Sequence, residues 1–258
     1  MNLFRPGFLK GAFKHLSILP RLIFTVRGWP NLLADCIGQD GKPYQLRTSS
    51  GVTCEIRPGA SDWWIFLEIF VFGIYRRAQE DIYRASVIID IGANVGFFGL
   101  YASSINPGVK VHAFEPFPKN ADQLCKNMTL NPSSHINLHQ AAVTDKTGMM
   151  KLYFSPGDDS GCTLNEVREQ SYSVKTVGIN EVFATCGITK CDLLKIDCEG
   201  SELSILRAAT SSVLLATQAI IMEYHILAEV ETIKNILSAA GFKCEVITPI
   251  KTIYAKRN

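Results

Sequence analysis

The sequence predicts an α/β fold in which helices cover both faces of a doubly wound, mostly parallel sheet. A short run of β-branched and aliphatic residues at 87–91 is followed directly by glycine, and a second predicted strand at 192–196, with Leu193, Leu194 and Ile196, is followed directly by an acidic residue. An apolar run such as the first is typical of a strand that is buried on both faces of a parallel sheet. Helix-like sequence at 95–105 separates the first run from a further apolar strand at 109–115. This order of strand, helix and strand is the repeating unit of a doubly wound sheet.

The remaining elements are predicted from turn residues and from the spacing of apolar residues. We expect helices at 118–130, 181–186, 201–209 and 228–240, strands at 135–143, 149–154, 173–177 and 218–222, and a terminal hairpin at 242–247 and 252–255. The run 155–161 is rich in Gly, Asp and Ser and predicts a long polar loop. A long loop inside a compact domain is often a functional lid.

The chain divides into two regions of different composition. Residues 1–60 are expected to form an extension that ends in a short hairpin, and residues 61–258 the main domain. The first 34 residues mix apolar side chains with five cations and contain no acid. This pattern predicts either a helix that packs on its own domain or on a second subunit of a homo-oligomer, or an amphipathic segment on an anionic membrane surface.

A cover helix is expected over residues 61–84, at the start of the main domain. Ser61 and Asp62 resemble a helix N-cap followed by an acid in the first turn. One side of this helix would carry Trp63, Phe66, Leu67, Phe70, Ile74 and Tyr75. Such an apolar face usually packs into the core, although it can also cover a ligand, which would bring Asp62, Glu68 and Tyr75 near a site.

Composition excludes several classes of protein. The net charge of +2 gives no case for a nucleic-acid partner, which needs a concentrated basic surface. The eight cysteines include no C-x-x-C pair, so neither a zinc knuckle nor a dense disulfide framework is predicted. No uncharged apolar run approaches the roughly 20 residues that span a bilayer, and no secretory cleavage site follows the basic N-terminus. We expect a cytoplasmic protein, at the periphery of the inner membrane if residues 1–34 bind lipid.

The turn at residues 92–96, Gly-Ala-Asn-Val-Gly, predicts a site for a nucleotide-like ligand. Glycine lets the backbone approach a ligand closely, and the free N–H groups at the start of a helix can receive an anionic group. A dinucleotide-binding turn has a third glycine where this chain has Phe97, so a pyrophosphate fits poorly. Glu115 ends the next strand, where a carboxylate can accept hydrogen bonds from a ribose diol. These features favour S-adenosylmethionine.

The chain contains three runs in a fixed order: VIIDIGANVG at 87–96, VHAFEP at 111–116 and DLLKIDCEGSE at 192–202. With these runs it resembles the FkbM family of class I methyltransferases over roughly residues 85–225. The resemblance implies a Rossmann-like, seven-stranded sheet whose last strand is antiparallel, which agrees with the expected terminal hairpin. It also implies an enzyme that uses S-adenosyl-L-methionine to methylate a hydroxyl group on a sugar, a glycan or a natural-product metabolite.

Roles for single residues follow from the matched positions. Asp90 would orient the turn or bind the methionine ammonium, and Glu115 would accept both ribose hydroxyls. Phe117 would flank the adenine ring, with Ala142 near its edge. The full set of expected cofactor-binding residues is Asp90, Gly92, Ala93, Asn94, Gly96, Glu115, Phe117 and Ala142.

A second group of polar residues follows the strands at 192–196 and 218–222. A sugar hydroxyl is a poor nucleophile, so a general base or a metal ion should assist. Asp197, Glu199 and His225 are the candidates for that base or for a metal ligand, with Glu223 at the same edge. Each also has a structural alternative, as a helix cap, a solvated turn acid and a structural histidine respectively. The spacing matches no diagnostic metal motif, so no metal site is predicted.

Two other functions stay open at this stage. A nicotinamide-dependent oxidoreductase would share the fold, and a non-catalytic scaffold or S-adenosylmethionine-binding pseudoenzyme would share the turn. The sequence does not distinguish among a sugar, a lipid-linked glycan, a polyketide and a small metabolite as the acceptor.

Overall fold

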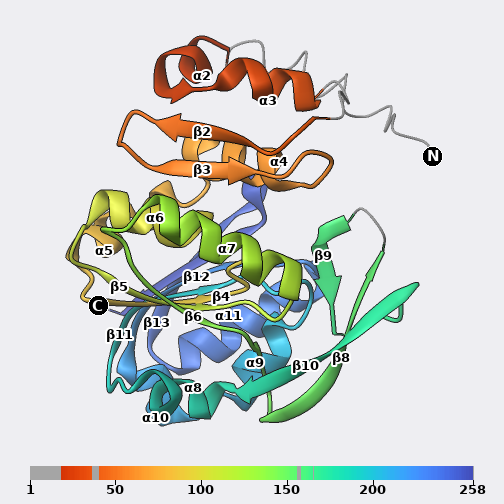
Figure 1. Cartoon of the computed structure of the whole chain (residues 1–258). Helices are drawn as coiled ribbons and strands as arrows, with labels where there is room; N and C mark the ends of the chain where they lie inside the picture. The colour runs from red at the N-terminus through yellow and green to blue at the C-terminus, as the bar shows by residue number, and fades with distance from the viewer. Residues whose placement is uncertain (1–18, 37–40, 156–157, 165, 258) are drawn as a thin grey trace.

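The computed structural model describes residues 19–36, 41–155, 158–164 and 166–257 (Figure 1). Its centre is a seven-stranded sheet in the order β13-β14-β12-β11-β4-β5-β6. The strands are β4 (Val87–Ile91), β5 (Lys110–Phe114), β6 (His135–His139), β11 (Cys191–Ile196), β12 (Thr217–Glu223), β13 (Phe242–Ile247) and β14 (Thr252–Arg257). Only β14 runs opposite to the other strands of this sheet. The predicted doubly wound sheet and its antiparallel C-terminal hairpin are confirmed.

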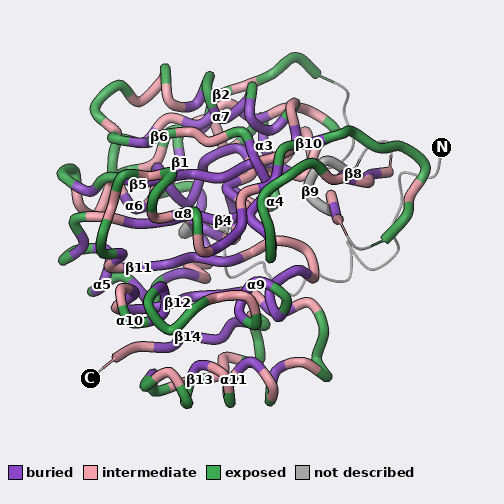
Figure 2. The backbone as a smooth tube through the Cα atoms, turned by 90° about the horizontal axis from the view of Figure 1, so that it is seen from below, coloured by how far each residue is buried: buried purple, intermediate pink, exposed green. Residues whose placement is uncertain are grey.

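Helices lie on both faces of this sheet (Figure 1). One face is covered by α5 (Gln79–Arg84), α6 (Phe97–Ile105) and α7 (Pro118–Leu130), and the other by α8 (Ile179–Cys186), α9 (Glu202–Ala208), α10 (Ser211–Ala216) and α11 (Val230–Ala239). The central strands β4 and β11 are buried along nearly their whole length, as Figure 2 shows. Their continuous apolar sequence is explained by helices on both sides.

A second sheet of four strands, in the order β7-β10-β8-β9, extends from the edge of the domain. Its strands are β7 (Ala142–Thr144), β8 (Gly148–Ser155), β9 (Asp158–Thr163) and β10 (Gln170–Gly178). The predicted pairing of 149–154 with 173–177 is confirmed. Two expectations were wrong: the run 135–143 divides into β6 and β7, which belong to different sheets, and most of the expected loop 155–161 forms β9.

The N-terminal region adds a third sheet, β1-β2-β3. Its elements are α2 (Leu19–Thr25), β1 (Val26–Arg27), α3 (Trp29–Cys36), β2 (Tyr44–Thr48) and β3 (Thr53–Ile56). Side chains of α7 bind this sheet, since Asn127 Oδ1 accepts a hydrogen bond of 2.8 Å from the N–H of Glu55. Leu22 and Leu32 are buried in the main core, so for residues 19–36 the predicted packing on the chain's own domain holds.

Residues 1–18 lie outside the described residues, and contact of the segment 1–34 with a membrane or a second subunit stays a prediction. No helix in the described part of the chain has the length and apolar character needed to cross a bilayer.

The expected cover helix over residues 61–84 is not continuous. It divides into α4 (Asp62–Phe66), the π-helix η2 (Leu67–Phe72), the 3₁₀-helix η3 (Arg76–Ala78) and α5. Gly73 ends the π-helix with a left-handed backbone, φ 71°. The Ser61 side chain makes no capping hydrogen bond, and Asp62 instead binds the Arg57 guanidinium at 2.7 Å. These breaks bend the segment over the carboxyl ends of the strands.

One close backbone contact brings two strand ends together. Gly92, directly after β4, has φ 76°, and a Cβ atom there would overlap the carbonyl oxygen of Asp197, directly after β11.

We predict that Gly92→Ala lowers the free energy of unfolding by about 2–3 kcal/mol, because the cost of the strained backbone and the cost of the steric overlap add. Gly187→Ala is the matched control, since its φ is 65° with nothing near a Cβ atom, and it should cost only about 1 kcal/mol. Equal losses for the two variants in urea unfolding would contradict this contact.

Candidate functional site

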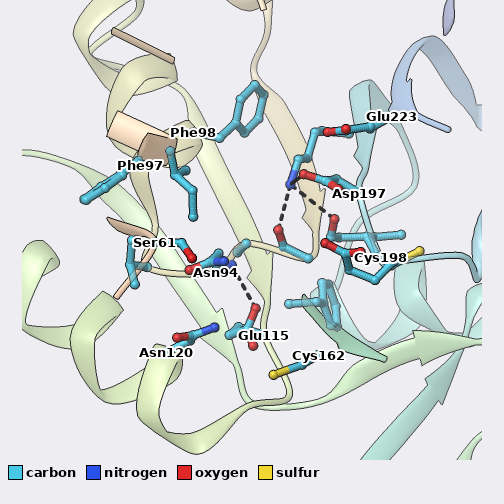
Figure 3. Close-up of a pocket in the computed structure, with 18 of the residues that line it drawn as sticks. Ser61, Asn94, Phe97, Phe98, Glu115, Asn120, Cys162, Asp197, Cys198 and Glu223 are labelled. Atoms are coloured by element: carbon cyan, nitrogen blue, oxygen red, sulfur yellow. Dashed lines mark hydrogen bonds and ion pairs between the residues drawn. The ribbon is translucent and has the colours of Figure 1, made fainter. Parts of the chain in front are cut away.

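A cavity of about 650 Å³ lies at the carboxyl ends of β4, β5, β11 and β12. The segment with α4 and η2 borders it on one side, and Cys162 and Leu164, at the end of β9 and just after it, border it on another. In Figure 3, Asn94 and Glu115 lie together at one end, and Asp197 and Glu223 lie together at the other. The site is therefore built where a doubly wound sheet normally binds its ligands.

The glycine turn forms one wall of the cavity. Its backbone is left-handed at Gly92, Asn94 and Gly96, with φ of 76°, 50° and 86°. The N–H groups of Gly92 and Ala93 both donate to the carbonyl oxygen of Phe114, at 3.0 Å each, which fixes the turn against the end of β5. Asn94 Oδ1 is buried and has no hydrogen-bond partner among the described residues. A buried acceptor of this kind suits a ligand that brings a donor.

Glu115 is held beside this turn by two backbone hydrogen bonds. Its Oε2 accepts from the N–H of Asn94 at 2.8 Å, and its Oε1 accepts from the N–H of Phe117 at 2.9 Å. Burial raises the pKa of Glu115 to about 7, although these two hydrogen bonds act in the opposite direction. Each carboxylate oxygen keeps a second lone pair. The pair of oxygens can therefore accept both hydroxyls of a ribose diol.

Lys195, in β11, connects the turn to the other half of the site. Its Nζ donates to the carbonyl oxygen of Gly92 at 2.7 Å and forms ion pairs with Asp90 at 3.1 Å and Asp197 at 3.6 Å. Burial by itself would lower the pKa of Lys195, but Asp90 and the other negative groups around it raise the pKa overall. Asp90 does not line the cavity. Of its two expected roles, this geometry supports orientation of the turn.

The other expected cofactor residues fall into two groups. Gly92, Ala93, Asn94, Glu115 and Ala142 all line the cavity. Gly96 and Phe117 are not among its lining residues. Gly96 packs against the Leu124 side chain, where there is no room for a Cβ atom. Phe117 is fully buried, in an apolar cluster in which its ring centroid lies 5.1 Å from that of Phe154.

The three expected catalytic residues do come together. His225 Nε2 lies 3.5 Å from Glu199 Oε2 and 3.9 Å from Asp197 Oδ1. On the other side of the ring, His225 Nδ1 is 2.8 Å from Oε1 of the buried Glu202. Burial by itself would lower the pKa of His225, but Glu202, Glu199 and Asp197 raise it to about 9.

Sequence reasoning did not assign Lys195 or Glu202 to the site. Both lie inside the third matched run, 192–202, but a lysine within an apolar strand and a glutamate in the first turn of a helix usually face solvent. Glu223 and Glu68 also line the cavity. Burial and the nearby Asp197 raise the pKa of Glu223 to about 8, and burial raises that of Glu68 to about 7. In the sequence, Glu223 was indicated as a site residue only by its position at the sheet edge, and Glu68 only by its position on the cover segment.

Three of these residues can also hold a cation. Asp197, Glu223 and His225 place one ligand atom each within 4.8 Å of one another. Carboxylate oxygens together with an imidazole nitrogen suit a divalent metal ion. The spacing in the sequence gave no such indication, because the ligands come from the ends of two different strands.

The model of the methyltransferase FkbM domain matches residues 90–244 of this chain. The chain belongs to the FkbM methyltransferase family. It is 27% identical over 211 residues to the 31-O-demethyl-FK506 methyltransferase FkbM of Streptomyces tacrolimicus, covering 70% of this chain and 81% of that protein. It is also 27% identical over 173 residues to the hexuronic acid methyltransferase AglP of Haloferax volcanii, covering 67% and 70%.

Among solved structures, precorrin-6y C5,15-methyltransferase of Geobacter metallireducens aligns with a TM-score of 0.45 and 16% identity over 72% of this chain and 89% of that chain. As an FkbM-family protein with a seven-stranded sheet in this order, the chain has the class I, Rossmann-like methyltransferase fold. It is a methyltransferase, and S-adenosylmethionine is its methyl donor. The nicotinamide and pseudoenzyme alternatives are therefore set aside.

Glu115 gives the most direct test of the cofactor site in this FkbM-family chain. We predict that Glu115→Gln weakens binding of S-adenosylmethionine by roughly 10- to 150-fold, or about 1.5–3 kcal/mol, because a charged acceptor for the ribose hydroxyls is lost. Calorimetry on the folded variant measures this, with Glu55→Gln, a glutamate that does not line the cavity, as the control. Unchanged affinity in folded Glu115→Gln would contradict the assignment.

Proposed function

We propose that the chain transfers the methyl group of S-adenosylmethionine to a hydroxyl group on a sugar, a glycan or a natural-product metabolite. The observation that carries this proposal is the His225–Glu202 pair, since His225 lines the cavity and its Nδ1 lies 2.8 Å from the Glu202 carboxylate. The relatives lend support, since one is named for methylation of demethyl-FK506 at an oxygen and another for methylation of a hexuronic acid.

The residues present fit the methyl donor. Gly92 and Ala93 line the cavity, the buried Asn94 Oδ1 would accept a hydrogen bond from its amino-acid end, and Glu115 would accept its ribose hydroxyls. When bound, S-adenosylmethionine supplies a methyl group on a positively charged sulfur, which a nucleophile can take in an in-line displacement. The protein contributes mainly by fixing the distance and direction of that approach.

His225 is the general base in this proposal. Its Nδ1–H donates to the Glu202 carboxylate at 2.8 Å, so Nε2, which lies 3.5 Å from Glu199 and 3.9 Å from Asp197, becomes the basic nitrogen once the ring has lost its second proton. A carboxylate behind an imidazole fixes the tautomer and stabilises the imidazolium that forms. Nε2 would thus take the hydroxyl proton of the acceptor as the oxygen attacks.

The far half of the cavity suits an acceptor with several hydroxyl groups. Glu68 and Glu223, with pKa values raised to about 7 and about 8 by burial, exchange between acid and carboxylate near neutral pH. They can therefore donate as well as accept hydrogen bonds. Trp63 and Trp64 add aromatic surface, with ring centroids 5.7 Å apart. Apolar ring faces with a few placed polar groups are typical of small-molecule sites.

A divalent ion is the second route to an activated hydroxyl, because Asp197, Glu223 and His225 can share one. In that case His225 would be a ligand, and the metal would lower the pKa of the acceptor hydroxyl. Activity that survives chelation by EDTA favours the base, whereas activity that is lost and restored by Mg²⁺ or Mn²⁺ favours the metal.

We predict that His225→Gln lowers methyl transfer by roughly 10²- to 10⁴-fold, the usual cost of a lost base, while S-adenosylmethionine still binds. The assay follows labelled methyl from the cofactor into a small-molecule extract, and mass spectrometry identifies the product. His135→Gln, an exposed histidine on β6, is the matched control. Wild-type turnover in His225→Gln would rule out both roles of this residue.

The pH dependence gives a further outcome of the same experiment. A base must be neutral to act, and the pKa of His225 in the free protein is raised to about 9. The ratio kcat/KM should therefore rise with pH up to about 9 and then level off, since its pH dependence reports the pKa values of the free enzyme. A profile that is flat between pH 7 and pH 9 would contradict this assignment.

A further inference from the structure

A second group of ligand-type side chains lies away from the cofactor cavity, where the methyl-transfer reaction does not use it. It consists of His112 in β5, His139 at the end of β6 and Cys186 at the end of α8. His112 precedes Phe114 by two residues and so points to the same face of the sheet, the face that packs against α8. Three elements therefore bring their side chains to one point at the edge of the domain.

We propose that His112, His139 and Cys186 bind one Zn²⁺ ion, a site that is separate from the catalytic centre. One nitrogen of each imidazole and one thiolate are the ligand types that zinc prefers. The three ligand atoms all lie within 4.8 Å of one another. This proposal does not depend on the nature of the methyl acceptor.

The distances match what a zinc ion requires. Zn–N bonds of about 2.0–2.1 Å and Zn–S bonds of about 2.3 Å in a tetrahedral site put neighbouring ligand atoms about 3.3–3.6 Å apart. Here His112 Nδ1 lies 3.1 Å from His139 Nε2, and His139 Nε2 lies 4.0 Å from Cys186 Sγ. All three pairs of ligand atoms lie within 4.8 Å, so small side-chain movements would bring them to these separations. Binding replaces the hydrogen bond between the rings, and the thiol proton of Cys186 is released to solvent.

Neighbouring contacts hold the ligands in place. The His139 ring stacks on Phe114 with centroids 4.5 Å apart and planes 12° apart, and it also stacks on His112. A ligand fixed in this way loses little conformational freedom when a metal binds. The main-chain oxygen of His139 accepts a hydrogen bond from the N–H of Glu115 at 3.2 Å. A metal ion here would thus connect the edge strand β6 to helix α8, next to Glu115 at the end of β5.

The site also has an approach from solvent. A second cavity, of about 530 Å³, is lined by His112, Cys186 and the following Gly187 and Ile188. It gives room for a water molecule as the fourth ligand beside the three protein ligands. Lys110 lines the same cavity, and its positive charge would favour a hydroxide or an anion in that fourth position over neutral water.

The test uses the full-length chain, stripped of metal and titrated with Zn²⁺ and then with Co²⁺. We expect one ion per chain at this site and, for Co²⁺, the absorption of a thiolate-to-cobalt charge transfer. Cys186→Ser should abolish that absorption, and His139→Gln should weaken binding by about 100-fold or more, beyond the loss typical of a changed supporting residue. Cys125→Ser is the matched control, because this side chain is exposed and lies outside the group and its cavity.

Two further measurements keep the test decisive if a variant does not fold. His225→Gln removes a ligand of the catalytic cluster and should leave the cobalt–thiolate absorption intact. In the unchanged protein, Zn²⁺ should slow alkylation of Cys186 but not of Cys125, as measured by peptide mass spectrometry. Absence of thiolate absorption, or equal alkylation of Cys186 with and without Zn²⁺, would overturn the proposal.

Discussion

The site depends on a buried lysine that joins two loops of the sheet. Lys195 Nζ lies between Asp90 and Asp197 and donates to the carbonyl oxygen of Gly92. Removing one charge of a buried pair leaves the other uncompensated, at a typical cost of about 3–5 kcal/mol, a large fraction of a domain's stability of about 5–15 kcal/mol. The loop after β4, which we propose holds the cofactor, and the loop after β11, which carries Asp197, are therefore positioned by one cation.

This arrangement gives the two halves of the cavity different electrostatics. On the cofactor side, Glu115 is paired with backbone N–H groups and can meet a neutral diol. On the acceptor side, several carboxyl groups lie close together, and mutual repulsion adds to burial in raising the pKa of Glu223. A protonated His225 offsets part of that negative charge. The acceptor half is thus suited to hydroxyl groups, whose protons the neutral form of this histidine would take.

Local sequence was sufficient for those parts of the fold that local signals determine. Apolar runs identified the buried strands, and Gly92 and Gly96 identified a tight turn, in which both have a left-handed backbone. Local sequence was not sufficient where contacts with distant residues determine the conformation of a segment. The cover segment 61–84 has the apolar pattern of one helix, yet Gly73 and packing over the sheet edge break it. The polar run after Ser155 contributes to β9 because β8 offers an edge to pair with.

The same reasoning applies to the site. Glu115 and His225 follow strands and were predicted from that position, and both line the cavity. Phe117 was expected beside adenine because it follows Glu115, but an apolar cluster with Phe154 buries its ring. Lys195 was missed because nothing in its own strand shows that Asp90, on the neighbouring strand, faces it. Such pairs are visible only once the register of the sheet is known.

A double-mutant cycle on Lys195 and Asp90, with S-adenosylmethionine affinity as the measured quantity, tests the central claim most directly. The four proteins are the unchanged chain, Lys195→Met, Asp90→Asn and the double variant, each measured by calorimetry. If the buried pair positions the cofactor turn, the single losses will not add, and the interaction free energy will be about 1–3 kcal/mol. Losses that add to within about 0.5 kcal/mol, or single variants with unchanged affinity, would contradict it.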